Sequence, residues 1–475
     1  MTNLRCMLEE AATISKHQPA IRQGERIILY SEWNELSAAV ARRLEERGVR
    51  RGDRIGLFMA TDWRMLVLIT GIIRAGAVAV PVSTRLPRAG VVASLRRVDS
   101  NRILAYLSEK KDGGLEGIEV WSPDDFLGTP ETAASPAPPM PLDAPAMIVF
   151  TSGSSNEPRP AVLSYGNLYY NAQGANANLR LHSKDTWLLN LPLYHVSGLG
   201  VMFRCMLGGA SVVIPEQRET LVQAIARYRP TFLSLVPTQL SDLLRENEVP
   251  GIDAARVLLV GGAACDPALV EQAVAKRWPV YLTYGMTETG SQIATMPVDA
   301  PPSRRMATSG KVLRHRTVRI ADDGEILVRG PCVFSGYWQD GAVQAATDAE
   351  GWWHTGDLGA VDADGYLTVR GRRDALIISG GENIQPEEVE ACLRAIEGVV
   401  QAVVLGVPHP RFGQRPVAVV KATGGDEMLW RKRLNAVLPA FKVPDAFFPW
   451  PDEPWAEGMK ASRARLAAWI AERSA

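Results

Sequence analysis

The chain has 475 residues, and its 52 lysines and arginines are balanced by 52 aspartates and glutamates. A chain of this length exceeds what one compact core can hold, so two or more domains are expected. The absence of net charge argues against nucleic acid or an anionic membrane as a partner, because both attract proteins through excess positive charge. A nucleic-acid function therefore has little support from composition.

The N-terminal segment is predicted to be neither a leader nor a membrane anchor. Acidic residues stand where a signal peptide would have its apolar stretch, so a cytoplasmic location is expected. The apolar run from Met65 to Ile73 is far shorter than the roughly 20 residues of a membrane helix, which favours a core helix and no membrane span. Five scattered cysteines without a CxxC pair predict reduced thiols.

Helices and strands alternate through the first half of the chain. Ser31 begins a predicted helix that closes near Gly48, with Leu36, Val40 and Leu44 at helical spacing. Strand and helix alternation predicts an α/β fold with a parallel sheet covered on both faces. The following elements are predicted as a strand over 54–58, a helix over 63–75, a strand over 77–80, a proline-rich linker over 130–145, a helix over 167–181 and a strand over 186–191.

The stretch AMIVFTSGSSNEPRP, from Ala146 to Pro160, combines an apolar strand with a small hydroxylated loop. Backbone N–H groups and hydroxyls of such a loop can converge on an anion, because no large side chain keeps a phosphate away. A surface turn would use the same residue types, so both interpretations stay open at this point. The GxxxxGK[ST] pattern of the common P-loop is absent. The loop residues concerned are Thr151, Ser152, Gly153, Ser154, Ser155 and Arg159.

A histidine follows the strand predicted over 186–191. Tyr194 and His195 lie in LPLYHVSG before a helix predicted over 199–207, a usual location for ligand contacts in open α/β sheets. A lone histidine at such a place is more often structural than functional. Further apolar strands are predicted over 211–214, 231–236 and 256–260, and the last opens into Gly261-Gly262-Ala263-Ala264. These small residues suit either a flat ring lying against the backbone or a tight strand-to-helix turn.

A second dense motif is YGMTETG, which follows a strand predicted over 280–283. Tyr284, beside Gly285, could stack on a base, and Thr287 offers a hydroxyl for a phosphate. Glu288 offers a carboxylate that could hold Mg²⁺ against phosphate oxygens. The motif therefore indicates a nucleotide site with a magnesium ligand.

Beyond this motif the sequence predicts hairpins and then a small C-terminal domain. Turns are expected at Asp323-Gly324 and Asp364-Gly365, and between them Asp357 could accept hydrogen bonds from a ribose diol. Gly371-Arg372-Arg373-Asp374 precedes a strand predicted over 375–379, then Gly380-Gly381 and a helix that opens near Pro386. About a hundred residues remain, which is enough for one small α/β domain. Lys460 lies in a polar loop near the end, where a solvated lysine is the ordinary alternative.

These motifs, in this order, resemble the adenylate-forming superfamily of acyl-CoA synthetases, adenylation domains and luciferases. The resemblance implies that a carboxylate is joined to AMP from ATP with Mg²⁺, and that the acyl group then passes to coenzyme A. It implies a large N-terminal domain, residues 1–373, with mixed, parallel-rich sheets and a β-rich part. It also implies a small mobile α/β domain, residues 374–475, with Asp374 as the hinge. The oligomeric state stays open, a homo-oligomer included.

The resemblance also implies roles for individual residues. Catalytic roles fall to Lys460, which should reach both the carboxylate and the α-phosphate, and to Thr287, Glu288 and His195, with Glu288 holding the metal. The phosphate loop is Thr151 to Pro160, and the pantetheine path of coenzyme A is lined by Gly380 and Gly381. The adenine should lie between Gly261, Gly262, Ala263 and Tyr284 with Gly285, and the ribose should lie against Asp357 and Arg372.

The phosphate loop departs from the family pattern SGTTGxPKG. Asn156 replaces a glycine, Arg159 replaces the lysine, and Pro160 replaces the last glycine. Arginine keeps the cation, but its planar guanidinium is not equivalent to an ammonium. Loss of glycine could stiffen the loop and weaken its hold on pyrophosphate.

Within the superfamily, LLNLPLYHVSGLGVMFRCMLGGA and the terminal GMKASR most resemble the o-succinylbenzoate-CoA ligases of menaquinone biosynthesis. That substrate carries a second carboxylate, so its pocket needs a cation. Arg204, nine residues after His195 in an otherwise apolar helix, is the candidate, and His195 and Ser197 are candidate acid contacts. The alternatives for Arg204 are snorkelling to the surface or pairing with an acidic residue. Other readings are an aryl- or fatty-acid-CoA ligase, or a non-catalytic nucleotide- or acyl-binding homologue with an eroded loop.

Overall fold

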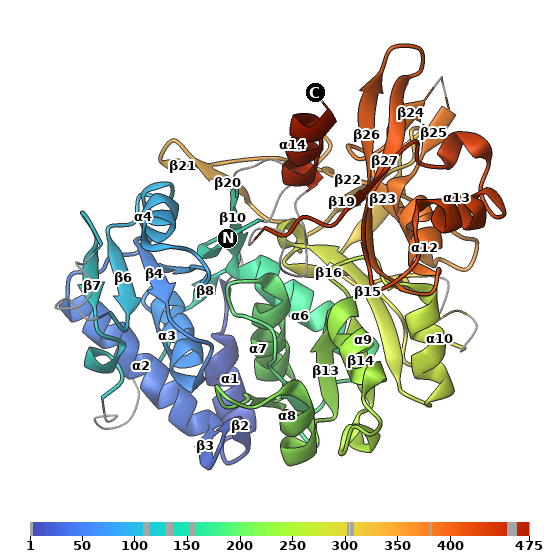
Figure 1. Ribbon diagram of the computed structural model, residues 1–475. Coiled ribbons are helices and arrows are strands. Elements are labelled where there is room, and N and C mark those ends of the chain that lie inside the picture. Colours follow the sequence, from blue (N-terminus) through green and yellow to red (C-terminus); the bar gives the residue numbers. More distant parts are fainter. Residues whose placement is uncertain are drawn as a thin grey trace.

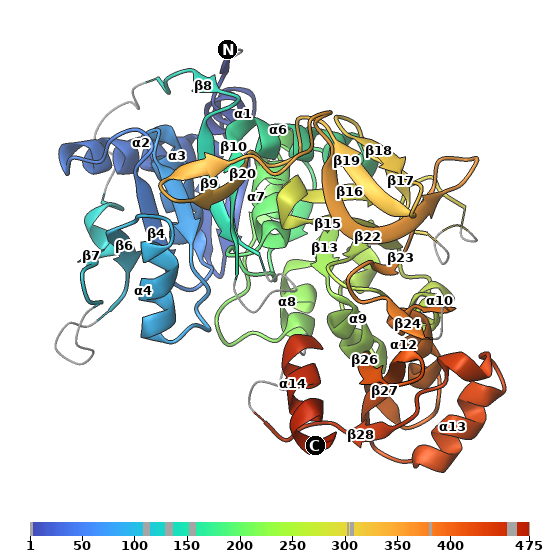
Figure 2. The same ribbon diagram turned by 90° about the horizontal axis from the view of Figure 1, so that it is seen from above.

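The computed structural model describes residues 3–107, 115–128, 136–151, 158–301, 304, 308–379, 382–453 and 463–474. Two large sheets stand side by side in the N-terminal part, with helices between them and on their outer faces (Figures 1 and 2). The first sheet has eight strands. In spatial order they are β21 (Ala342–Gln344), β20 (Gly336–Gln339), β10 (Pro160–Ser164), β9 (Pro145–Phe150), β5 (Val78–Pro81), β4 (Arg54–Phe58), β6 (Arg102–Ala105) and β7 (Glu119–Trp121).

The second sheet has nine strands. Its centre is parallel, while β15 pairs antiparallel with β16. In spatial order the strands are β17 (Lys311–Val312), β16 (Ser291–Thr295), β15 (Val280–Met286), β14 (Val257–Val260), β13 (Phe232–Leu235), β11 (Thr186–Leu188), β12 (Ser211–Val213), β2 (Pro19–Gln23) and β3 (Arg26–Leu29).

Smaller sheets complete the chain. A four-stranded antiparallel sheet has the order β18 (Thr317–Ile320), β19 (Glu325–Arg329), β22 (Trp353–Val361) and β23 (Leu367–Arg372). The predicted turns at Asp323-Gly324 and Asp364-Gly365 connect β18 to β19 and β22 to β23. A short pair near the N-terminus joins β1 (Asn3–Leu4) to β8 (Met140–Pro141). The C-terminal sheet has the order β25 (Glu382–Ile384), β24 (Ile377–Ser379), β27 (Gly413–Ala422) and β26 (Val399–His409), and β28 (Phe447–Pro449) pairs with β27.

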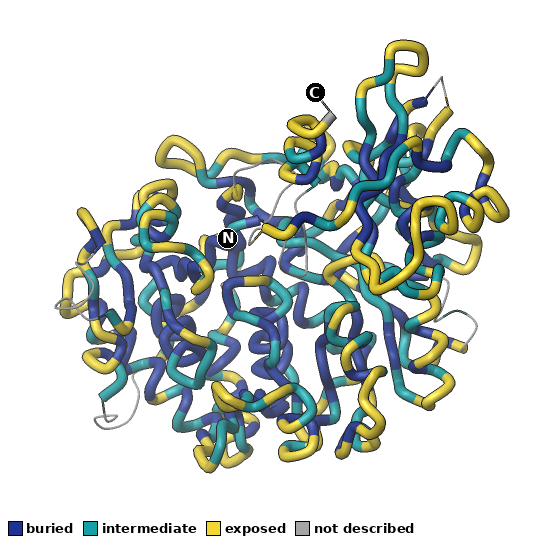
Figure 3. Tube along the Cα trace, viewed as in Figure 1, coloured by how far each residue is buried: buried dark blue, intermediate teal, exposed yellow. Residues whose placement is uncertain are grey.

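Helices of the N-terminal part cover both large sheets. Residues of both sheets share one apolar core, and the outer face of each sheet has a further core of its own. Figure 3 shows this burial as dark blue running through the centre of both sheets. The helices are α1 (Met7–Ile14), α2 (Tyr30–Glu46), α3 (Trp63–Arg74), α4 (Arg88–Arg96), α6 (Tyr165–Leu179), α7 (Val196–Gly208), α8 (Leu221–Tyr228), α9 (Pro237–Arg245) and α10 (Pro267–Ala275).

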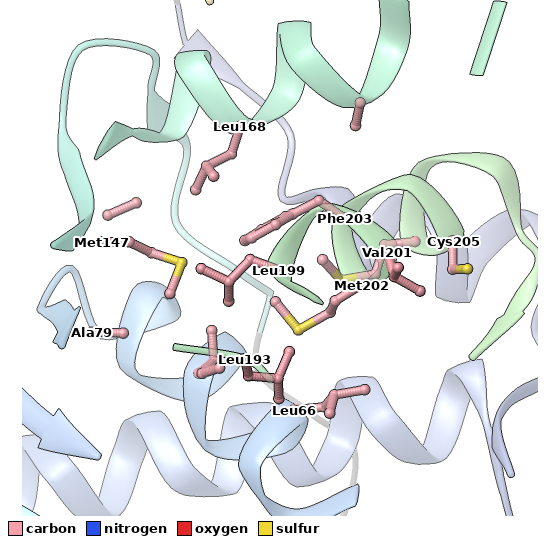
Figure 4. Close-up of a cluster of buried hydrophobic side chains, with 14 of the residues drawn as sticks. Leu66, Ala79, Met147, Leu168, Leu193, Leu199, Val201, Met202, Phe203 and Cys205 are labelled. Carbon is pink, nitrogen blue, oxygen red and sulfur yellow. The ribbon is translucent and has the colours of Figure 1, made fainter. Parts of the chain in front are cut away.

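Helices α3 and α7 show how apolar segments of the sequence form the buried core. Every residue of α3 from Met65 to Arg74 is buried, and the Asp62 side chain accepts hydrogen bonds from the first backbone N–H groups of the helix. Helix α7 lies between the two large sheets in both views (Figures 1 and 2). Gly209 ends α7 in the left-handed conformation, with φ of 68°, which glycine adopts without strain. In Figure 4 the apolar side chains Leu199, Met202 and Phe203 of α7 lie among those of other elements. These are Leu66 of α3, Met147 of β9 and Leu168 of α6.

The C-terminal part has its own apolar clusters on both sides of β26 and β27. Its helices are α12 (Pro386–Arg394), α13 (Glu427–Asn435) and α14 (Arg463–Ser474). These observations confirm the predicted α/β class, with a large N-terminal and a smaller C-terminal part. The boundary between residues 373 and 374 stays a prediction.

Several predicted elements differ from the structure at their ends; for example, the strand predicted over 186–191 ends at Leu188. Two of these differences lie beside candidate site residues. The strand predicted over 280–283 continues to Met286, because its second half pairs antiparallel with β16 across a bulge at Tyr284-Gly285. The helix predicted over 199–207 begins earlier, at Val196, so that His195 is the residue that precedes its first turn. Among the described residues, no helix is long and apolar enough to cross a membrane. All five cysteines are described and are free thiols, as predicted.

Candidate active site

Candidate residues from different sheets meet near the end of β15. The Tyr284 hydroxyl donates a hydrogen bond of 2.6 Å to Asp357 Oδ2, which joins the nine-stranded sheet to the four-stranded sheet. On the other side of Asp357, Arg372 Nη1 donates to Oδ1 at 3.2 Å and to the Thr355 carbonyl at 3.0 Å. Asp357 and Arg372 are direct partners in the β22–β23 pair, which explains their proximity. The structure therefore brings together the three residues that sequence assigned to the nucleoside.

Burial governs the electrostatics of this group, which we call the Asp357 cluster (Tyr284, Asp357, Arg372 and Asp374). Asp357 is 9% exposed, and this burial raises the pKa of its carboxyl, while the Tyr284 hydroxyl and Arg372 oppose the rise. Burial likewise raises the pKa of Tyr284 well above its ordinary value. Arg372 also donates hydrogen bonds to the Asp374 carboxylate, from Nε at 3.0 Å and from Nη2 at 3.1 Å. The predicted hinge residue is therefore tied to the predicted ribose residues by one guanidinium.

Glycines in this region satisfy packing demands of the strands. A Cβ on Gly261 would lie 2.6 Å from Cγ2 of Thr283 on β15, and Gly262 has φ of 82°. A side chain on Gly285 would collide with the carbonyl of Ser291 at the bulge between β15 and β16. The turn interpretation of Gly261-Gly262 thus has direct support. Ala263 is exposed, and its contact with an adenine stays a prediction.

Thr287 and Glu288 lie in a short 3₁₀ turn, η3 (Thr287–Thr289), directly after β15. The Tyr337 hydroxyl donates to Glu288 Oε1 at 2.7 Å, and within the described chain it is the hydrogen-bond partner found for this carboxylate. The described residues hold no group of three or more His, Cys, Asp or Glu suited to a metal ion. The metal role of Glu288 stays a prediction from the sequence.

The remaining predicted residues of the acid pocket lie on α7. His195 is exposed and precedes the helix, with its ring edge-on to Tyr194 at a centroid distance of 4.7 Å. Ser197 lies in the first turn and Arg204 in the third. Ser197 and Arg204 are seven residues apart and therefore share one face of α7, separated by a rise of about 10 Å along the helix.

Arg204 is 1% exposed, although it carries a charge. Its Nη2 donates to Ser291 Oγ at 3.0 Å, its guanidinium carbon lies 5.5 Å from the centre of the Trp187 ring, and its Nε has no hydrogen-bond partner among the described residues. Neither alternative from sequence holds: the side chain does not reach the surface, and no described acidic residue forms an ion pair with it. Burial, and then the neighbouring Arg316, lower the pKa of Arg204. An anion beside Arg204 would oppose both effects by raising its pKa.

The phosphate loop is described only at its ends. The Thr151 N–H donates to the Arg159 carbonyl at 2.9 Å, and Arg159 N–H donates to Thr151 Oγ1 at 3.4 Å. The Arg159 guanidinium carbon lies 3.5 Å from the centre of the Tyr337 ring. The other predicted loop, pantetheine and lysine residues lie outside the described residues; these are Ser152, Gly153, Ser154, Ser155, Gly380, Gly381 and Lys460.

Sequence reasoning missed three residues of this region: Tyr337, Ser291 and Arg316. Ser291 has φ of 139°, a backbone conformation that disfavours side chains, and its hydroxyl contacts Arg204. Arg316 is buried, and its guanidinium donates to the carbonyls of Gln292 and Arg314. The pairing of β20 with β10 positions Tyr337 beside Glu288. No local pattern in the sequence predicts that pairing.

Comparison with known proteins decides the family. The family described as AMP-binding enzyme matches residues 8–338, and the C-terminal domain of AMP-binding enzymes matches residues 388–454. The chain belongs to the AMP-binding enzyme family. This AMP-binding enzyme is 35% identical to a 2-succinylbenzoate–CoA ligase from Geobacillus kaustophilus over 94% of this chain and 93% of that protein. It is 33% identical to a 2-succinylbenzoate–CoA ligase from Bacillus cereus, with 88% of each chain covered.

Solved structures agree with this assignment. The o-succinylbenzoate coenzyme A synthetase of Bacillus subtilis, in complex with its acyl-adenylate intermediate, superposes with a TM-score of 0.88 at 30% identity over 98% of both chains. The same synthetase with ATP and a magnesium ion gives a TM-score of 0.87 at 29% identity, covering 98% of this chain and 100% of that one. The predicted enzyme class is therefore confirmed: this AMP-binding enzyme is an AMP-forming acid–CoA ligase.

Proposed function

We propose that this enzyme ligates o-succinylbenzoate to coenzyme A at the expense of ATP, through an acyl-adenylate, as a step of menaquinone biosynthesis. The activities named for its relatives support the reaction. The observation that carries the choice of acid is Arg204, a buried guanidinium without an acidic partner among the described residues. A buried charge is costly unless it is paired, so a ligand anion at this place would stabilise the bound state strongly.

A diacid suits the surroundings of Arg204 better than a monoacid. One carboxylate of o-succinylbenzoate must react, while the other, on the benzene ring, needs a permanent partner. In this proposal Arg204 binds the ring carboxylate, and Ser291, which accepts a hydrogen bond from Arg204, fixes the guanidinium. His195 and Ser197 lie at the opposite end of α7, where the reacting end of the acid would meet the nucleotide.

The Asp357 cluster suits a ribose. Tyr284 and Arg372 each use one oxygen of Asp357. A carboxylate offers about four acceptor sites, so roughly two remain for the hydroxyls of a diol. We assign the adenine to the side of Tyr284, where Gly261, Gly262 and Ala263 follow β14 and where Gly285 lets two strands approach closely.

Glu288 and Thr287 suit a magnesium nucleotide. A lone carboxylate with one oxygen held by Tyr337 fits Mg²⁺, which binds proteins through one or two carboxylates and takes its other ligands from phosphates and water. When bound, the ion would neutralise charge on the phosphate oxygens. We assign Thr287 to the α-phosphate and the Thr151–Pro160 loop to the pyrophosphate.

Two anions must meet in the first half-reaction, so cationic and N–H groups have to offset their repulsion. We assign this role to Lys460, whose ammonium group would contact both the attacking carboxylate and the α-phosphate. Rotation about Asp374 would then withdraw Lys460 and bring Gly380 and Gly381 to the pantetheine. Lys460→Ala is expected to impair adenylation strongly while thioester formation from supplied acyl-adenylate persists; equal loss of both steps would contradict rotation.

The test of the acid is pyrophosphate release with ATP and Mg²⁺, with and without coenzyme A. The panel contains o-succinylbenzoate, 4-oxo-4-phenylbutanoate, benzoate and a medium-chain fatty acid. We expect release with o-succinylbenzoate, followed by thioester formation, and much weaker release with 4-oxo-4-phenylbutanoate, which lacks only the ring carboxylate. Equal activity with both keto acids would contradict the role of Arg204. Preference for benzoate or the fatty acid would identify a different ligase.

We place the enzyme in the cytoplasm in this proposal, because ATP and coenzyme A are both supplied there. Gel filtration with light scattering would establish whether the enzyme self-associates.

A further inference from the structure

Tyr337 occupies a position between the phosphate loop and Glu288. It lies on β20 opposite Ala161 of β10, and Arg159 lies two residues before Ala161. Side chains two residues apart along an extended strand point to the same face, so Arg159 and Tyr337 share one face of this sheet edge. Tyr337 is 8% exposed, and its ring packs edge-to-face against Phe334 and Trp353 at centroid distances of 4.8 and 6.1 Å. The ring is therefore fixed by its neighbours.

The two ends of Tyr337 contact two charged residues. Its hydroxyl donates to Glu288 Oε1 at 2.7 Å, and the face of its ring lies 3.5 Å from the guanidinium carbon of Arg159. The backbones around these contacts are also tied together. The Phe334 N–H donates to the Glu288 carbonyl at 2.8 Å, and Thr151 and Arg159 bond to each other across the ends of the loop.

The arginine that replaces the family lysine suits this arrangement. A planar guanidinium stacks on an aromatic face and keeps its N–H groups in its own plane, where they can still donate to a phosphate. The Tyr337 hydroxyl occupies one oxygen of Glu288 and leaves the other for a further ligand. A single tyrosine thus orients both a cation at the phosphate loop and the carboxylate beside it.

We propose that Tyr337 is a positioning residue for the magnesium nucleotide: its hydroxyl sets the orientation of Glu288 toward Mg²⁺, and its ring holds Arg159 against the phosphates. This inference rests on the proposed function, which assigns Glu288 to the metal. It predicts that the two ends of the side chain act separately. The hydroxyl controls the metal dependence of nucleotide binding, and the ring controls binding in the absence of metal.

The test measures ATP binding by titration calorimetry without an acid substrate, over a series of Mg²⁺ concentrations and in EDTA. Tyr337→Phe keeps the ring, so we expect unchanged ATP affinity in EDTA and about a tenfold higher Mg²⁺ concentration for half-maximal enhancement. Tyr337→Leu should show the same metal effect and, in addition, an ATP affinity in EDTA lower by about fivefold, because cation–π contacts stabilise by roughly this factor.

Two further variants define the origin of the effect. In Glu288→Gln, the additional change Tyr337→Phe should leave the metal dependence unaltered, because the partner of the hydroxyl has already been changed. Tyr281→Phe is the matched control: Tyr281 is a buried tyrosine whose hydroxyl donates to the Val298 carbonyl at 3.3 Å, away from Glu288. It should match the wild-type enzyme at every Mg²⁺ concentration.

The outcomes separate this inference from the proposed function. If Tyr337→Phe leaves the Mg²⁺ dependence unchanged while the wild-type enzyme shows one, the positioning role is wrong and the metal site stands. Equal loss of affinity with and without Mg²⁺ in Tyr337→Phe would also overturn it, because that result indicates a structural role. If the ATP affinity of the wild-type enzyme does not depend on Mg²⁺ concentration, both the metal assignment to Glu288 and this inference are wrong.

Discussion

Arg372 and Arg204 are both candidate active-site residues, and they differ in whether their charge is paired with a carboxylate. Arg372 keeps 41% of its side chain exposed and still has two carboxylate partners, Asp357 and Asp374. Arg204 is 1% exposed and has no carboxylate partner within the described chain. Proteins ordinarily pair the charges that they bury, so the arrangement at Arg204 is the reverse of the usual one.

The difference suggests two modes of recognition. In the Asp357 cluster each charged group already has a partner of opposite charge before a ligand arrives, so a neutral diol could bind by hydrogen bonds to fixed acceptors. At Arg204 the balance is incomplete, so an anion from the substrate would complete it. The first arrangement suits the part of the substrates that every family member shares, and the second suits the part that distinguishes one acid from another.

The largest expected effect comes from removing the unpaired charge. Arg204→Leu should lower kcat/KM for o-succinylbenzoate by about 150-fold or more, because a buried, charge-assisted contact stabilises by roughly 3–5 kcal/mol. The same change should alter kcat/KM for 4-oxo-4-phenylbutanoate less than about threefold. Arg180→Leu, at an exposed arginine that pairs with Asp299, serves as the control. An equal loss for both acids would mean that Arg204 supports the fold.

A second change tests the strand contact that links the two regions. Gly285 adjoins Tyr284 and packs on Ser291, the partner of Arg204. Gly285→Ala should lower the free energy of unfolding by about 2–3 kcal/mol, because a methyl group cannot fit against the Ser291 carbonyl. Gly365→Ala, at a turn glycine with φ of 80° and open space around it, should cost about 1 kcal/mol. Urea unfolding measures both, and equal costs would contradict the close approach.

A third change perturbs the paired cluster. Asp357→Asn should raise KM for ATP by about 10- to 30-fold and leave KM for the acid within about twofold, because hydrogen bonds to a charged group stabilise by roughly 1.5–3 kcal/mol. Steady-state kinetics with each substrate varied in turn separates the two constants. A comparable rise in KM for the acid would mean that the cluster also shapes the acid pocket.

The smallest expected effect is a pH dependence of stability at Asp357. Burial raises the pKa of this carboxyl in the folded protein. The protonated form is thus favoured by folding, and its contribution is fully present below the unfolded pKa of about 4 and is lost as pH rises through the folded pKa. Asp357→Asn should therefore gain stability relative to the wild type as pH rises from about 4 to 7. The opposite trend in urea unfolding would show that Arg372 outweighs burial.

Local sequence patterns predicted much of the fold. The apolar run of α3, the strand at Arg54–Phe58 and the hairpin turns at Asp323-Gly324 and Asp364-Gly365 were all recognisable, because each is set by residues adjacent in the chain. Element ends were less predictable. β15 extends to Met286 only because β16 pairs with it, and that pairing depends on residues that follow the motif.

The candidate site likewise contains residues that local motifs predicted and residues that only long-range strand pairing brought there. Asp357, Tyr284 and Glu288 were singled out from the chemistry of neighbouring residues, and the resemblance to the family added Arg372. Tyr337 was missed because its role depends on β20 lying beside β10, a strand that is far away in the chain. Ser291 was missed because a strained backbone angle has no sequence signature outside glycine.

By itself, the sequence determined the family, the order of many elements and the residue types of the candidate nucleotide site, because short motifs carry the local geometry that phosphates and ribose require. Only the tertiary structure decided which charged side chains are paired and which are buried. Whether an arginine is paired or isolated depends on which distant strands surround it, and whether a tyrosine can orient a carboxylate depends on the register of two strands. Long-range packing therefore decides the pairing and burial on which the proposed choice of acid rests.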